Sequence, residues 1–260
     1  MTFELKNVRY CWKARHTPAH EIFRDLSVQI GHGESVGILG REGSGKTTML
    51  TLLGGLVRPD QGSIRLDGVD CLSDKSSGYQ VRLRIAFTFQ FPDEQFLCTT
   101  IREEFRDILH LRNVSAEESH ARMEEALHLM GMNPEAVCER SPFSLSLGES
   151  RRIAIALALA LHPEGAIFDE PTSGLDSEGT ERAVRAFRAL HQSGATIVIA
   201  THDADLLRQV AGRVIVIDEG RIVLDGATTD LLRDPSLLMR FGYEEIALTA
   251  GNAKEGDGKP

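Results

Sequence analysis

One segment of eight residues, at positions 40–47, constrains the fold of this chain more than any other feature. It reads G-R-E-G-S-G-K-T and fits the pattern G-x-x-x-x-G-K-[ST]. The apolar residues 35–39 before it predict a buried strand, and the leucine spacing in residues 46–56 predicts a helix. A strand, a glycine-rich turn and a helix in this order are typical of an α/β fold.

This turn has the chemistry of a phosphate-binding site. Glycines let successive backbone N–H groups curl around phosphate oxygens, and the helix N-terminus adds a partial positive charge. We expect Lys46 to reach the β- and γ-phosphates of a nucleoside triphosphate, and the Thr47 hydroxyl to bind Mg²⁺. A plain glycine-rich turn is the simpler alternative, which the flanking strand and helix disfavour. The predicted nucleotide-binding residues here are Gly40, Gly43, Ser44, Gly45, Lys46, Thr47 and Thr48.

Two further apolar stretches end in residues that suit phosphate hydrolysis. Residues 165–168 precede Asp169 and Glu170, and residues 196–200 precede His202. The carboxyl ends of parallel strands meet at one edge of a sheet, where ligands bind. We expect Asp169 to hold Mg²⁺, Glu170 to polarise the attacking water and His202 to hydrogen-bond the γ-phosphate. Taken alone, the acidic pair is an exposed strand end, and a single histidine is more often structural.

A fourth segment, L-S-L-G-E at positions 145–149, begins another helix. Ser146 and Glu149 match the S-x-x-E capping box, ahead of a predicted helix at 150–161 that is apolar nearly all round and therefore buried. Two arginines in its first turn oppose the helix dipole but suit a nearby anion. An ordinary helix start is the alternative. Because the chain offers no evident ligand for this helix start, we interpret it as half of a site that another molecule completes.

Together these segments resemble the ATP-binding subunits of ABC transporters, over nearly all of residues 3–240. Residues 40–47 resemble Walker A, residues 167–170 resemble Walker B with its catalytic glutamate, and residues 145–149 resemble the signature segment. Residues 173–176 are similar to the D-loop. The resemblance implies an α/β P-loop NTPase fold of the RecA-like kind, with a mostly parallel sheet, a β-rich layer and a helical subdomain.

The same resemblance implies a site shared between two subunits. In that family two ATPase subunits meet head to tail, and each signature segment clamps the ATP held by the other subunit's Walker A. The implied cofactors are ATP and Mg²⁺, and the implied catalytic residues are Lys46, Gln90, Glu170 and His202. The implied nucleotide contacts from the other segments are Ser146, Gly148 and Asp176, and the implied Mg²⁺ ligands are Thr47, Gln90 and Asp169.

A finer resemblance is to the energy-coupling-factor importers and their cobalt- and nickel-type relatives. The segment F-Q-F-P-D-E-Q-F at 89–96 is similar to their extended Q-loop, and S-P-F-S-L at 141–145 is similar to the residues before their signature. It implies that the chain powers import of a vitamin or transition metal, together with integral membrane subunits, from the cytoplasmic face of the membrane. A soluble, non-transport ABC ATPase and a degenerate partner subunit with weak hydrolysis are the alternatives.

One aromatic residue of the first strand is a candidate for stacking on adenine. Trp12 stands where these proteins usually carry a tyrosine, and stacking needs only the face of the ring. The residues leave two alternatives open: Tyr10 stacks instead, or Trp12 is a buried aromatic of the strand.

Two residues depart from the usual signature, L-S-G-G-Q. Leu147 replaces a glycine, which costs roughly 1–2 kcal/mol if its φ is positive and nothing if its φ is negative. Glu149 keeps the capping acceptor but brings negative charge towards an anionic nucleotide. We hypothesise that this segment clamps ATP less well than the standard one and suits a heterodimer.

Composition limits the partners. The net charge of −9 and the lack of a basic stripe argue against nucleic acid. The four cysteines form no C-x-x-C pair, which suits free thiols in a reducing cytoplasm. No apolar run approaches the roughly 18 residues that span a bilayer, so we expect docking on separate membrane proteins. The expected docking surface lies near residues 90–100, where Phe91, Phe96 and Leu97 are either exposed or part of the core.

The expected organisation is one ABC ATPase domain at 1–240 followed by a tail. Its β-rich and nucleotide-binding core comprises residues 1–90 and 155–240, and its helical subdomain comprises residues 91–154. In the tail, residues 241–260, the last ten are Gly-rich and charged and are predicted to be disordered.

Overall fold

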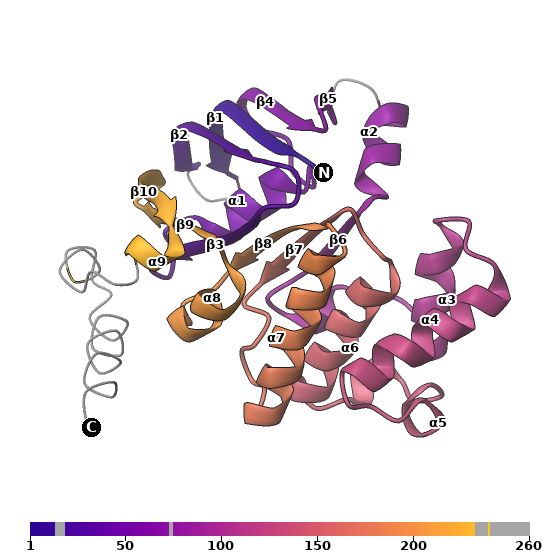
Figure 1. Cartoon of the computed structure of the whole chain (residues 1–260). Helices are drawn as coiled ribbons and strands as arrows, with labels where there is room; N and C mark the ends of the chain where they lie inside the picture. The colour runs from indigo at the N-terminus through magenta and orange to yellow at the C-terminus, as the bar shows by residue number, and fades with distance from the viewer. Residues whose placement is uncertain (14–18, 73–74, 232–238, 240–260) are drawn as a thin grey trace, which may run out of the picture.

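The computed structural model describes residues 1–13, 19–72, 75–231 and 239. Its centre is a six-stranded sheet in the order β10-β9-β3-β8-β7-β6 (Figure 1). The strands are β3 (Ser35–Gly40), β6 (Ile85–Thr88), β7 (Gly165–Asp169), β8 (Thr196–Ala200), β9 (Arg213–Asp218) and β10 (Arg221–Ala227). All neighbours pair in parallel except β10, which forms an antiparallel hairpin with β9. The sheet is therefore mostly parallel, as predicted.

A smaller antiparallel sheet lies above one face of this sheet (Figure 1). Its strands, in the order β2-β1-β4-β5, are β1 (Phe3–Trp12), β2 (His20–Ile30), β4 (Gln61–Leu66) and β5 (Val69–Asp70). Helix α1 (Lys46–Leu53) lies between the two sheets and buries Met49, Leu50, Leu52 and Leu53 against them. This helix ends at Leu53 rather than Leu56 because two glycines follow, of which Gly55 has a φ of +63°.

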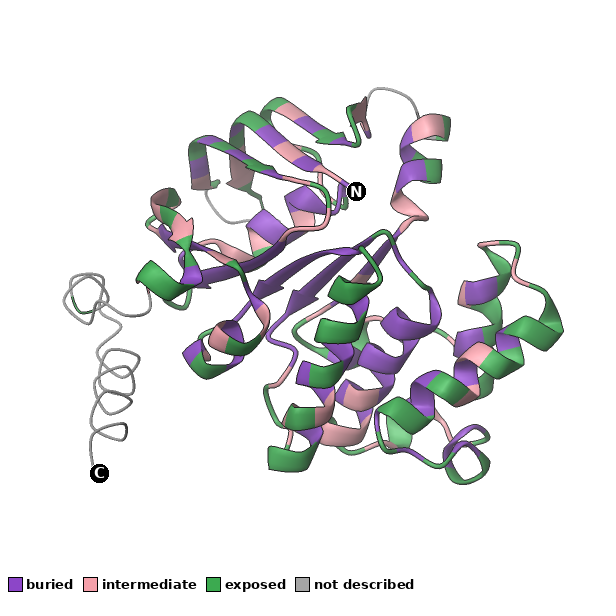
Figure 2. Cartoon of the chain, viewed as in Figure 1, coloured by how far each residue is buried: buried purple, intermediate pink, exposed green. Residues whose placement is uncertain are grey.

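Helices cover the other face of the six-stranded sheet. They are α6 (Leu147–Ala160), α7 (Ser177–Gln192) and α8 (Ala204–Val210). Because parallel strands covered on both faces must be apolar throughout, β3, β7 and β8 are buried along their whole length (Figure 2). Helix α6 is buried from Ser150 to Ala160 at every position except Arg152, so the prediction of a buried helix is confirmed.

The helical region on the side of α6 contains α3 (Ile101–His110), α4 (Ala116–Leu129) and α5 (Pro134–Val137). Thr100 caps α3 in a reciprocal box with Glu103, and the Ser115 hydroxyl accepts the Glu118 N–H at the start of α4. Short 3₁₀ turns at Pro92–Glu94 and Pro142–Ser144 flank this region. Among the described residues, the further helices are α2 (Lys75–Arg82) and α9 (Thr228–Leu231).

The predicted boundary between the helical subdomain and the core does not coincide with a loop. The boundary placed between residues 154 and 155 falls within α6, which runs from the signature segment to the face of the sheet without a break. The predicted tail at 241–260, including its predicted disorder, lies outside the described residues.

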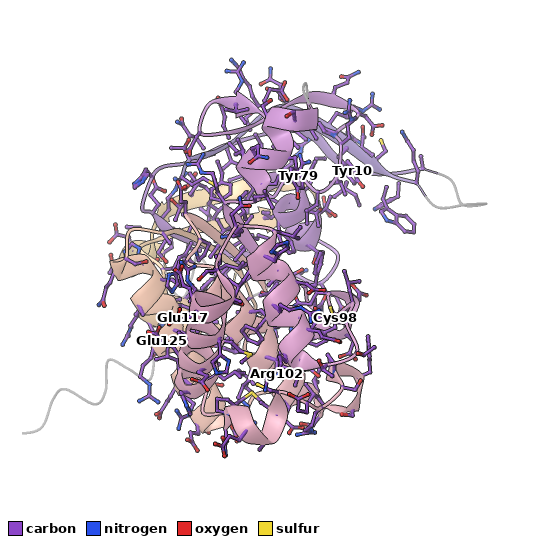
Figure 3. All side chains as sticks on the ribbon, turned by 90° about the vertical axis from the view of Figure 1, so that its right-hand side faces the viewer. Tyr10, Tyr79, Cys98, Arg102, Glu117 and Glu125 are labelled. Atoms are coloured by element: carbon purple, nitrogen blue, oxygen red, sulfur yellow. The ribbon has the colours of Figure 1, made fainter. Side chains whose placement is uncertain are left out.

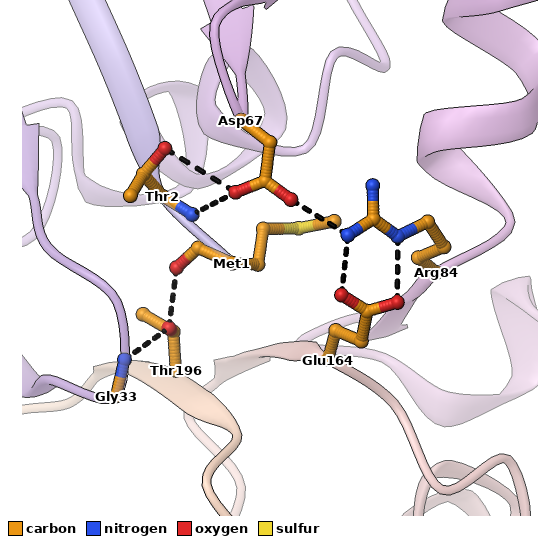
Figure 4. Close-up of polar contacts among 7 residues, drawn as sticks. All are labelled: Met1, Thr2, Gly33, Asp67, Arg84, Glu164 and Thr196. Carbon is orange, nitrogen blue, oxygen red and sulfur yellow. Dashed lines mark hydrogen bonds and ion pairs between the residues drawn. The ribbon is translucent and has the colours of Figure 1, made fainter.

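A polar network joins the two layers at the amino ends of the parallel strands (Figure 4). The Thr196 hydroxyl donates to the Met1 carbonyl oxygen at 2.5 Å. Arg84 donates to Asp67 and to Glu164, each at 2.7 Å, and so links a turn of the smaller sheet to the start of β7. These bonds stabilise the amino ends of the strands. The site residues lie at the opposite, carboxyl ends.

Candidate functional site

The carboxyl ends of β3, β7 and β8 lie side by side because these strands are neighbours in the sheet. Ile38 pairs with Ala200, and Ala200 pairs with Asp169. A cavity of about 720 Å³ opens at this edge. The predicted site residues in its walls are Gly40, Gly43, Gly45, Lys46, Thr47, Thr48, Gln90, Asp169, Glu170 and His202. The structure therefore brings together residues from four distant parts of the chain.

The loop at 40–47 requires glycine for steric reasons. A Cβ on Gly40 would lie 2.3 Å from the Ser44 hydroxyl oxygen and 2.8 Å from the Ile217 carbonyl oxygen. Gly45 has a φ of +109°, in the region that favours glycine. The Ser44 hydroxyl is buried and has no hydrogen-bond partner among the described residues. An unpaired donor inside a glycine-rich loop suits a phosphate oxygen.

Lys46 lies across the mouth of the loop. Its Nζ donates to the Gly40 carbonyl oxygen at 2.7 Å and to the Arg41 carbonyl oxygen at 3.2 Å. These contacts hold the ammonium group at the cavity wall, on the loop that would surround the phosphates.

Thr47 and Asp169 meet in the wall of the cavity. The Thr47 hydroxyl donates to Asp169 Oδ2 at 2.6 Å. Burial raises the pKa of Asp169, the Thr47 bond opposes that shift, and the neighbouring Glu170 charge adds to it. A hydroxyl and a carboxylate at this separation are oxygen donors of the kind that Mg²⁺ prefers.

Glu170 is held from several sides. Its backbone has a φ of +44°, and its N–H donates to the Ala200 carbonyl oxygen at 2.8 Å. One carboxylate oxygen accepts the Thr201 hydroxyl at 3.0 Å, and the other lies 3.0 Å from His202 Nδ1. The Glu170 side chain is 10% exposed and that of His202 is 76% exposed. The pair therefore joins a sheltered carboxylate to an imidazole open to the cavity.

Thr201 is a site residue that the sequence analysis missed. Its hydroxyl accepts the Asp203 N–H at 3.1 Å, so the hydroxyl hydrogen is left to donate to Glu170. Thr201 is fully buried. The available signal was a hydroxyl residue directly before the histidine that follows a strand.

Arg151 links two loops beside the cavity, one at Ser173 and one at Phe89. Its buried guanidinium donates to the Ser173 carbonyl oxygen at 3.2 Å and to the Phe89 carbonyl oxygen at 3.3 Å. Phe89 directly precedes Gln90, and both Gln90 and Ser173 line the cavity. Burial lowers the pKa of Arg151, and the charges of the Walker B carboxylates oppose that shift. The sequence predicted an arginine near an anion, but not this bridge between two loops.

A family model described as ABC transporter matches residues 23–173, which is more than half of the chain. The chain belongs to the ABC transporter family. It is therefore an ATP-binding and ATP-hydrolysing protein, as the four segments predicted.

Curated relatives narrow this to one branch of the family. An energy-coupling factor transporter ATP-binding protein EcfA2 from Streptococcus sanguinis is 37% identical over 259 residues, covering 98% of this chain and 92% of the relative. A protein of the same name from Clostridium perfringens is 33% identical, covering 93% and 85%. The predicted resemblance to energy-coupling-factor ATPases is confirmed.

Solved structures confirm the predicted P-loop NTPase fold. The dimeric, post-hydrolysis ATP-binding cassette MJ0796, bound to ADP and Pi, superposes with a TM-score of 0.79 at 30% identity, covering 87% of this chain and 98% of that one. CbiO1 from Clostridium perfringens, part of the ABC transporter complex cbiONQ, superposes with a TM-score of 0.73 at 25% identity, covering 97% and 98%.

Five predicted nucleotide contacts are not among the residues that line the Walker A cavity: Trp12, Ser44, Ser146, Gly148 and Asp176. Ser146 caps the N-terminus of α6, and Asp176 caps α7 by accepting the Gly179 N–H at 2.7 Å. Trp12 is 52% exposed, whereas Tyr10 is partly buried against the core. The part of the chain that the structure describes thus leaves the signature segment outside the cavity of its own chain.

The two residues that depart from the usual signature, Leu147 and Glu149, fit the structure without backbone strain. Leu147 is absent from the described non-glycine residues with positive φ, so it carries no backbone strain. Its side chain is half exposed and lies against Gly174 of the D-loop. Glu149 completes the capping box with Ser146 and pairs with Arg140 at 2.7 Å. The backbone therefore gives no reason for a weaker signature.

The predicted docking surface is partly exposed. Phe91 is 58% exposed and Leu97 is 88% exposed, whereas Phe96 is buried in the core beside α3. Among the helices of the described residues, none combines the length and the apolar character needed to cross a bilayer.

Proposed function

We propose that this chain powers an importer of the energy-coupling-factor type, by closing head to tail with a second ATPase subunit around ATP. The observation that carries the proposal is the separation of two parts. The cavity holds Walker A, Walker B, Gln90 and His202, while Ser146 at the start of α6 lies outside it. A second subunit that presents its own signature segment would complete the site.

Thr47 and Asp169, with Gln90 at the cavity wall, are the proposed Mg²⁺ ligands. The hydroxyl and carboxylate oxygens already meet at 2.6 Å, and Asp169 itself is buried. When bound, Mg²⁺ would neutralise charge that develops on the β- and γ-phosphate oxygens.

In the proposed reaction, Glu170 polarises the attacking water, and Thr201 and His202 fix its carboxylate. With hydrogen on both ring nitrogens, His202 donates to Glu170 through Nδ1 and to the γ-phosphate through Nε2. Lys46 would exchange its bonds to the Gly40 and Arg41 carbonyl oxygens for phosphate oxygens. Each exchange replaces a contact within the loop by one to the nucleotide.

The proposed partners are a second ABC ATPase subunit, identical or different, and integral membrane subunits. Relatives named for energy-coupling factor transporters, and a structural neighbour from a transporter complex, support this assignment. Phe91 and Leu97, exposed next to Gln90, would form part of the surface that docks on the membrane subunits. The chain would then sit peripherally at the cytoplasmic face, and the cargo would be a vitamin or a transition metal.

The test of the closed dimer is Glu170→Gln. This variant should bind ATP, fail to turn it over and accumulate as a dimer in size-exclusion chromatography. Adding Lys46→Ala should abolish the dimer, because the triphosphate then loses its cationic contact. Full turnover by Glu170→Gln would remove Glu170 as the base.

Copurification with a membrane protein tests the transport role, and its failure would favour a soluble ABC ATPase.

A further inference from the structure

The acidic residue of the signature segment is turned toward its own chain. Glu149 Oε2 accepts the Ser146 N–H and the Ser146 hydroxyl, both at 2.9 Å. Its other oxygen, Oε1, accepts the Arg140 guanidinium at 2.7 Å. The bond from Arg140 is the largest cause that lowers the pKa of Glu149 to about 2, so the carboxylate is ionised at neutral pH.

Two backbone hydrogen bonds fix the main chain at Arg140. Its N–H donates to the Val137 carbonyl oxygen at 3.0 Å, and its carbonyl oxygen accepts the Ile101 N–H at 3.1 Å at the start of α3. Within the described part of the chain, Arg140 is the one basic residue that forms an ion pair with Glu149. Arg151, in the same turn as Glu149, is instead engaged with the D-loop and the residue before Gln90.

We propose that Arg140 is a positioning residue of the ATPase reaction, which neutralises Glu149 so that this signature can receive the triphosphate held by the second subunit. The inference rests on the proposed head-to-tail dimer. The N-terminus of α6 favours an anion through its unpaired N–H groups and the helix dipole. An unpaired carboxylate in the same turn would oppose that attraction, and Arg140 cancels it while Glu149 continues to cap the helix.

Three variants, two single and one double, should differ in their KM for ATP. Arg140→Gln exposes the charge of Glu149 and should raise the apparent KM for ATP about 3- to 5-fold at low salt, with a smaller change in kcat. Glu149→Gln keeps an amide oxygen for the capping box and removes the negative charge, so the KM for ATP should not rise. In the double variant no charge needs compensation, so KM should return to its original value.

The experiment measures MgATP turnover by the assembled transporter that contains the full-length chain, at low and at high salt. High salt should reduce the increase in KM caused by Arg140→Gln, because screening weakens repulsion between separated charges. The matched control is Arg102→Gln, which breaks another exposed Arg–Glu pair, with Glu139 at 2.6 Å. Arg102 lies on α3 in the helical region (Figure 3), and its replacement should leave KM unchanged.

Two results would overturn the inference. One is an unchanged KM in Arg140→Gln. The other is a defect that persists in the double variant, since that would show a structural role for Arg140. Ser146→Ala in the same assay tests the proposed dimer separately. If Ser146→Ala is defective and Arg140→Gln is normal, the dimer stands and only the role of Arg140 is lost.

Discussion

Thr47 Oγ1 donates a hydrogen bond of 2.6 Å to Asp169 Oδ2, across 122 positions of sequence. The bond joins the first turn of α1 to the end of β7, two strands away from the strand that leads into the phosphate loop. It brings together the hydroxyl and the carboxylate that we propose as Mg²⁺ ligands. The relationship follows from strand order, because β3 and β7 both flank β8.

Asp169→Asn should have opposite effects on folding stability and on ATP turnover. Burial raises the pKa of Asp169, so the ionised carboxylate is disfavoured in the folded protein and the neutral amide should increase stability. ATP turnover should fall at least about 100-fold, because the charged ligand is gone. Thermal unfolding and an ATPase assay measure both effects. Thr47→Ser, which keeps a hydroxyl, is the control. Unchanged turnover in Asp169→Asn would contradict the assignment.

Thr201→Val removes one hydroxyl from a site of the same shape. Glu170 should lose a fixed donor, and kcat should fall about 10-fold, the equivalent of a hydrogen bond to a charged group. The KM for ATP should change little, because Thr201 is buried and does not line the cavity. Steady-state kinetics measures both, and Thr201→Ser should be close to the unmodified protein. Equal activity of the valine and serine variants would show that the hydroxyl does not position Glu170.

Arg151→Met tests the bridge beneath the cavity. It leaves the carbonyl oxygens of Ser173 and Phe89 without their buried donor, so the free energy of unfolding should fall by about 1–3 kcal/mol. Turnover should fall as well, since the two loops lose their common support. Arg152→Met, at the half-exposed next position, should change stability by less than about 0.5 kcal/mol. Urea denaturation compares the two. Similar losses in both variants would argue against a special role for Arg151.

Glu149 gives a pH dependence of stability with a definite sign. Its pKa lies at about 2 in the folded protein, below the ordinary value of 4.5, because Arg140 and Ser146 bind the ionised form. The stabilising contribution is therefore complete above about pH 4.5 and is lost as the pH falls toward 2. Urea denaturation from pH 7 to pH 3.5 should show the advantage of the unmodified protein over Glu149→Gln shrinking only below about pH 4.5. An advantage that does not vary with pH would contradict the ion pair.

Much of the fold and half of the site could be read from local patterns. Residues 40–47, with an apolar strand before them and a helix after, indicated a phosphate loop, and the structure places Gly40, Lys46 and Thr47 around one cavity. Asp169 and His202 were assigned to the same edge because each follows an apolar strand, and the sheet brings them there. These features depend on spacing along the chain, which a sequence displays directly.

Other contacts depend on which surfaces the fold brings together. Arg151 was expected to suit a nearby anion, but the sequence did not indicate that its guanidinium donates to two carbonyl oxygens. The charge on Glu149 was expected to reach toward nucleotide, yet Arg140 holds it from a loop that no local pattern connects to the signature. A side chain with several rotamers takes the partner that packing offers, and that partner is not encoded in its neighbours.

The α/β order of elements, the phosphate loop and the residues at the strand ends follow from local patterns in the chain, because turn geometry and apolar periodicity are local properties. The fold was needed to show that Thr201 donates to Glu170, that Arg140 pairs with Glu149 and that Ser146 lies outside the cavity of its own chain. Those three outcomes depend on the packing of segments far apart in the chain. Strand order and helix placement determine that packing, so these contacts cannot be predicted from the residues next to each position.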